Sequence, residues 1–96
     1  MTDAELQSWW PELGTLVAEL RQIGQALVAE SMLDALSGST SGEILGDLGL
    51  SMRKHRTLRA QLSDIAMQAW DTIMADINKN YPVARLVEWI ARMTNR

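Results

Sequence analysis

The sequence predicts an all-α protein, and two observations carry that prediction. Apolar residues recur at intervals of three and four through every long segment, and no stretch alternates apolar and polar residues as a half-buried strand would. The 96 residues are 47% hydrophobic and 22% charged, which is too apolar for a disordered chain. We therefore expect one domain over residues 1–96: an antiparallel helical hairpin and a third amphipathic helix, forming a small bundle that is completed by dimerisation.

The first helix is predicted over about residues 4–36, with Pro11 near its start. Thr2 and Glu5 have the spacing of a capping box. Apolar residues from Leu13 onward share one face of this helix, and Gly24 lies within that face. The missing side chain of Gly24 would either let another helix approach closely or simply weaken the helix by about 1 kcal/mol.

A short polar segment, residues 37–42, predicts the loop of the hairpin. The second helix is expected over about residues 43–79, because its apolar residues repeat with the 3-4 spacing of an antiparallel seam. Gly46 and Gly49 weaken its beginning, so a break at residues 49–51, with Ser51 capping a new helix, is a second possibility.

Asn80, Tyr81 and Pro82 predict the end of the second helix, since proline disfavours helix immediately before it and suits a first turn. The third helix is then expected over about residues 82–94. One face of it is apolar and the other is charged. The apolar face contains Val83, Leu86, Val87, Trp89, Ile90 and Met93, and the charged face contains Arg85, Glu88 and Arg92.

Charge is divided unequally along the chain. Residues 1–48 contain eight acidic residues and one basic residue, a balance of −7, whereas residues 49–96 contain eight basic and four acidic residues, a balance of +4. Such a division favours contact between the halves, within one copy or between copies. Arg53, Lys54, Arg56 and Arg59 surround the only histidine, His55.

His55 and Arg59 both fall on the predicted seam of the second helix, as polar residues in an apolar repeat. We expect Arg59 to have a structural role, with its head group on Glu19, or on Glu30 if the helix begins late. His55 is expected at the rim of the same seam, and its alternative role is a proton switch. Together with Gly24, these residues form the predicted structural seam.

Methionine and tryptophan are abundant for so small a chain, at six and four residues. Such residues usually form a core, but they also anchor adaptable protein interfaces, and the sequence leaves both interpretations open. The candidate partner-binding residues are Arg53, Lys54, Arg56, Met67, Trp70, Met74, Trp89 and Met93.

Residues 44–59 also resemble a helix-turn-helix. Gly49, Leu50 and Ser51 would supply the turn and the cap of a recognition helix, followed by basic residues where DNA phosphates would lie. Leu45 and His55 depart from the small and aliphatic residues usual at their positions. Residues 53–58 further resemble part of the small helical antiactivators of conjugal-transfer regulators, through a pattern too common to identify a family.

The sequence lacks the residue sets that catalytic, metal-binding and cofactor-binding sites require. Without cysteine there is no disulfide, thiolate or zinc–thiolate site, and we find no catalytic, cofactor-binding or metal-binding set, so an enzyme is not expected. An acidic beginning and the absence of a long apolar run favour a cytoplasmic protein without a membrane partner. We expect a protein-binding regulator or adaptor, antiactivator-like or immunity-like, that forms a homodimer. DNA-binding transcriptional regulation is the alternative.

Overall fold

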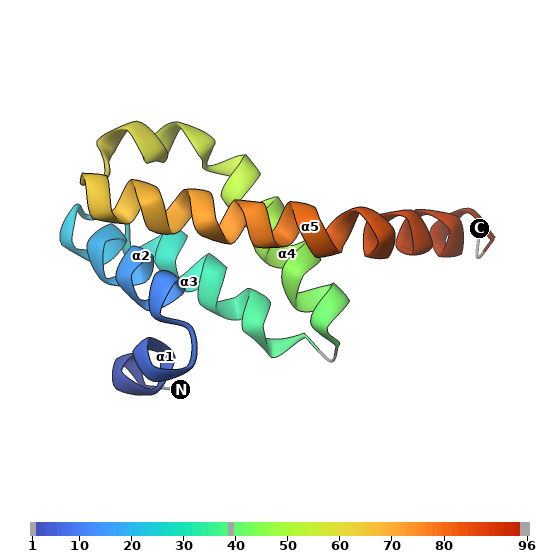
Figure 1. The fold of residues 1–96 in the computed structure, drawn as a ribbon, viewed down its shortest axis with the longest axis horizontal. Helices are drawn as coiled ribbons and strands as arrows, with labels where there is room; N and C mark the ends of the chain where they lie inside the picture. The colour runs from blue at the N-terminus through green and yellow to red at the C-terminus, as the bar shows by residue number, and fades with distance from the viewer. Residues whose placement is uncertain (1, 39, 95–96) are drawn as a thin grey trace.

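The computed structural model describes the backbone of residues 2–38 and 40–94, and the side chains of residues 2–38, 40 and 42–79. The described backbone is helical without a strand, which confirms the all-α prediction (Figure 1). In chain order the elements are α1 (Asp3–Trp9), α2 (Pro11–Gln22), α3 (Ala26–Asp34), the 3-10 turn η1 (Ala35–Ser37), α4 (Ser41–Lys54), the 3-10 segment η2 (Arg56–Gln61) and α5 (Asp64–Thr94).

The core forms where α5 packs against both α2 and α4. The short helices α1 and α3 both pack against α2, and α3 also contacts α4. Removing these apolar faces from water is the main force that holds the helices together. The largest fully buried side chains are Leu6, Leu13, Leu16, Val17, Leu20, Met32, Leu48, Met52, Ile73 and Ile77.

Two threonines cap the helices that begin after turns. The Oγ1 of Thr2 accepts a hydrogen bond from the Glu5 N–H at 3.1 Å, as the capping spacing predicts. The Oγ1 of Thr40 accepts from the Glu43 N–H at 3.1 Å and so begins α4 at Ser41, within the loop predicted over residues 37–42.

Gly24 ends a helix instead of lying in a helix-packing face, so this part of the seam prediction is wrong. Its φ is +83°, and the Gln25 N–H donates to the Leu20 carbonyl at 2.7 Å, the long bond of a Schellman motif. No atom lies within 4 Å of a Cβ built on Gly24, so no neighbouring helix requires the glycine. The single helix predicted over residues 4–36 is therefore divided at Trp10 and again at Gly24.

We expect Gly24→Ala to lower the free energy of unfolding by about 1–2 kcal/mol, because a left-handed backbone crowds an L-residue's Cβ. Gly24→Asn should lose less, since asparagine tolerates this conformation better. Urea unfolding followed by circular dichroism measures both variants. Equal stability of Gly24→Ala and the wild type would contradict the role assigned to this turn.

The helix predicted over residues 43–79 is broken too, but between residues 55 and 63. α4 ends at Lys54, η2 follows, and Leu62 is extended at ψ 155° before α5 begins. Ser63 caps α5, because its Oγ accepts the Ala66 N–H at 3.3 Å. The apolar repeat through residues 55–62 therefore does not form one seam, and this turn lets α5 pack back over α2 and α4.

The chain stays helical at residues 49–51, where a break was a second possibility, and at residues 80–82, where the second helix was expected to end. Residues 49–51 lie inside α4, where the glycine at 49 faces α5: a Cβ there would lie 3.1 Å from the Cγ2 of Ile77. Its small size permits close helix packing, which offsets its low helix propensity. α5 likewise runs through Pro82, since a proline inside a helix removes one hydrogen bond without preventing helix on either side.

Candidate functional site

The basic cluster lies at the carboxyl end of α4. Positive charges there interact favourably with the negative end of the helix dipole, and this interaction accounts for part of the clustering. Lys54, at the end of α4, and Arg56, at the start of η2, are exposed, whereas Arg53 and His55 are half-buried. His55 is the C-cap residue, and its N–H donates to the Ser51 and Met52 carbonyls at 3.2 Å. The exposed part of the cluster therefore consists of Lys54 and Arg56.

Arg59 forms an ion pair within the chain, but its partner is not the one that the sequence suggested. Its Nε and Nη2 donate to the two carboxylate oxygens of Asp71 at 2.8 and 2.7 Å, which ties η2 to α5. This hydrogen-bonded pair raises the pKa of Arg59 and lowers the pKa of Asp71. Both side chains are partly exposed, so Arg59 does not lie in a buried helix seam.

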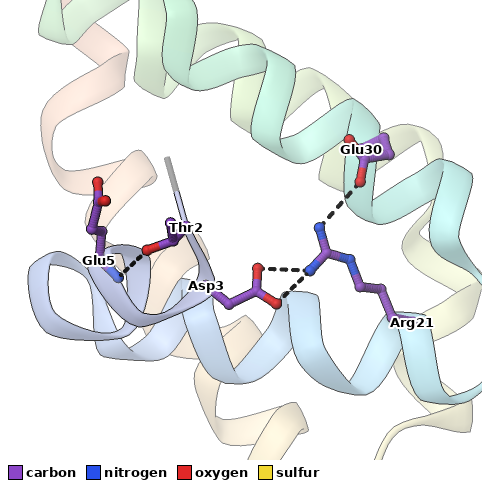
Figure 2. A network of polar contacts seen from close by, with 5 residues as sticks. All are labelled: Thr2, Asp3, Glu5, Arg21 and Glu30. Carbon is purple, nitrogen blue, oxygen red and sulfur yellow. Dashed lines mark hydrogen bonds and ion pairs between the residues drawn. The ribbon is translucent and has the colours of Figure 1, made fainter.

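The two acids expected near Arg59 have other partners. Glu19 accepts the N–H of Ser63 at 2.6 Å and also its hydroxyl, which joins α2 to the start of α5. Glu30 pairs with Arg21 at 3.1 Å, and Arg21 also binds both carboxylate oxygens of Asp3 (Figure 2). The described ion pairs of Arg21 and Arg59 thus join residues within the same half of the chain.

Of the three described members of the candidate Met and Trp set, one lies in the core and the other two pack against it. Trp70 is only 5% exposed, and Met67 and Met74 are half-buried against the same cluster. These positions favour packing within one copy over contact with a partner. Trp89 and Met93 lie outside the residues whose side chains the structure describes.

The second candidate surface is the distal part of α5, residues 80–94. Ile77 is the last buried residue described on this helix, and its methyl group faces α4 at Gly49. Beyond it the helix runs out past the other elements, and no other described helix lies alongside it (Figure 1). The sequence of this part repeats apolar residues at helical spacing, so the backbone presents an amphipathic segment away from the core.

The structure does not place a helix-turn-helix at residues 44–59. Residues 48–51 are in the middle of α4, so no turn separates two helices there and no recognition helix begins at Ser51. Ser51 instead is buried against α3, with its Oγ 2.8 Å from that of Ser31. The bases that follow are in the last turn of α4 and in η2.

A surface that the sequence prediction did not identify is the outer stripe of α4. Asp47, Leu50 and Lys54 are exposed, and they border a groove between α3 and α4. Their spacing of three and four residues places them on one face of a helix, but the spacing alone does not show that this face is exposed. Leu27, at the start of α3, is also exposed.

Among the described residues, no group of three or more histidine, cysteine or acidic side chains could hold a metal ion. None of the helices over residues 2–38 and 40–94 has the length and apolarity needed to span a membrane. No protein-family model, curated protein or solved structure matches this chain.

Proposed function

We propose that this chain is a cytoplasmic protein-binding regulator or adaptor without catalytic activity, and that it binds its partner through the distal part of α5. The observation that carries the proposal is the projection of this segment beyond the helices that bury the first half of α5. Isolated helices of about 15 residues are marginal in water, so tertiary contact supplies most of a helix's stability. A protein partner would supply that contact.

The sequence of the distal part fits a helix that enters an apolar groove. Val83, Leu86, Val87 and Ile90 fall on one face by their spacing, the pattern of helix-in-groove recognition. The polar face has two arginines against one glutamate, which suits a groove with an acidic rim. Arg56, exposed at the start of η2, adds attraction for the same kind of partner.

Affinity capture with paired variants tests this proposal. Leu86→Glu/Ile90→Glu places two charges on the apolar face, and Ala84→Glu/Ala91→Glu places the same charges beside it. We expect the first variant to lose a specific protein partner from a lysate of the native source, because an unpaired charge in an apolar groove costs several kcal/mol. The second variant should retain that partner. Equal capture by all three proteins would exclude this face.

DNA binding is the competing result. Fluorescence anisotropy with labelled duplex DNA over a salt series should show only weak binding at physiological salt, given the −7 balance of residues 1–48. Sub-micromolar binding that falls steeply with salt, and that is lost on reversal of Arg53 and Arg56 to glutamate, would replace the protein-binding proposal with DNA binding.

A further inference from the structure

The groove between α3 and α4 has opposite charges along its length. It has a volume of about 340 Å³ and is lined by Ser31, Asp34, Ala35, Asp47, Leu50, Ser51 and Lys54. Asp34 and Asp47 are both acidic, while Lys54 follows Asp47 by seven residues, or about 10.5 Å along the axis of α4. Leu50 lies between them on the helix. Along α4 the stripe therefore consists of an acidic residue, a leucine and a basic residue, in that order.

These charged groups have no partner within the described part of the chain. The side chains of Asp34, Asp47 and Lys54 take part in none of its hydrogen bonds or ion pairs. Leu50 is 55% exposed between them, although burying a leucine side chain is thermodynamically favourable. Asp47 and Lys54 lie on either side of an exposed leucine on one helix. A second copy of that helix, running antiparallel to the first, can form an ion pair with each of them.

We propose that a second copy of this chain occupies the groove, with the two α4 helices antiparallel about a two-fold axis between Leu50 and Ser51. When Asp47 faces Lys54 of the second copy, Lys54 faces Asp47 of that copy, because each contact of a two-fold interface occurs twice. The same register places Leu50 opposite Ser51 of the second copy, at the middle of its groove. Asp34 adds a second carboxylate at the end that receives the lysine.

Charge selects this arrangement, and burial of the two Leu50 side chains adds to its stability. Exposed ion pairs contribute little affinity but fix register and orientation, whereas a parallel pairing of the two α4 helices would set like charges against each other. The interface uses α4 and α3, so it goes beyond the proposed function and does not depend on the distal part of α5.

Two charge-reversal variants test whether a second copy of the chain occupies the groove between α3 and α4. Asp47→Lys makes positions 47 and 54 both basic, and Lys54→Glu makes both positions acidic. We expect each variant alone to dissociate at least about tenfold more readily than the wild type in sedimentation equilibrium at low salt. An equal mixture of the two should associate again as a heterodimer. In that mixture the lysine introduced at position 47 of one chain faces the glutamate introduced at position 54 of the other, and the unchanged Lys54 faces the unchanged Asp47.

The mixture separates loss of the interface from loss of the fold, since a misfolded variant cannot form a specific heterodimer. A wild type that stays monomeric at the highest soluble concentration, unchanged association of either variant, or a mixture that stays monomeric although both variants have the helicity of the wild type would each overturn the proposal. Leu86→Glu/Ile90→Glu should leave self-association unchanged. Failure of the proposed function would therefore appear in the capture experiment alone, and failure of the dimer in sedimentation alone.

Discussion

Replacing Trp70 with alanine should lower the free energy of unfolding by about 3–5 kcal/mol, the usual cost of emptying a buried aromatic site. Trp70 lies in the core cluster on α5 and is only 5% exposed. The loss combines the transfer free energy of the indole with the cavity left between α5 and its neighbours. Total stabilities of small domains are about 5–15 kcal/mol, so this variant should melt far below the wild type.

Trp9→Ala is the matched control, because Trp9 is 59% exposed. It loses mainly an edge-to-face contact with Trp10, at 6.0 Å between ring centroids, and such contacts contribute about 0.5–1.5 kcal/mol. Urea unfolding of the two variants compares them directly. Similar small losses would place Trp70 at an interface, as the sequence left open, and would contradict its burial in one copy.

Gly49→Leu should also destabilise the fold, by about 1–3 kcal/mol, because a larger side chain would overpack the crossing of α4 and α5. A Cβ at this position would already lie 3.1 Å from the Cγ2 of Ile77, and the side chain of Arg53 closes the space on another side. Gly49→Ala should change stability much less, since the gain in helix propensity of about 1 kcal/mol opposes the tight contact.

A double-mutant cycle tests the cause of the Gly49 effect. Ile77→Leu removes the Cγ2 methyl group, so Gly49→Ala should be more favourable in that background than in the wild type. The readout is the difference between the two changes in unfolding free energy, measured by urea titration. If the changes simply add, Gly49 is not the contact point between these helices.

Local signals in the sequence were sufficient for the elements that depend on neighbouring residues. The periodicity of three and four predicted the helices, and the spacing of Thr2 and Glu5 predicted the cap of α1. Gly24 was misassigned because a glycine inside an apolar repeat has the same pattern whether the helix continues or ends there. Only its left-handed backbone distinguishes the two cases.

Contacts distant in sequence determined the remainder. Ser63 begins a helix in a region whose repeat continues unbroken, and Glu19, on α2, accepts both its N–H and its hydroxyl. Arg59 could be assigned a structural role but not its partner, because Asp71 becomes its neighbour only after the chain turns at residues 55–63. A polar residue in an apolar repeat indicates a tertiary contact, but the repeat does not identify the residue that it contacts.

The candidate surfaces were predicted in part. Lys54 and Arg56 were candidate binding residues and are exposed, whereas Trp70 could not be assigned to core or interface until α5 was placed against α2 and α4. The stripe of Asp47, Leu50 and Lys54 was not identified, because the sequence does not show which face of a helix stays exposed after the other helices pack against it.

Photo-crosslinking in living cells tests most directly whether the distal part of α5 binds another protein. A photoreactive phenylalanine derivative is placed at position 90, on the apolar face, or at position 88, on the charged face opposite. We expect one dominant adduct with a different protein from position 90 and little or none from position 88. Equal labelling from both positions, or adducts only with nucleic acid, would contradict protein binding through this face.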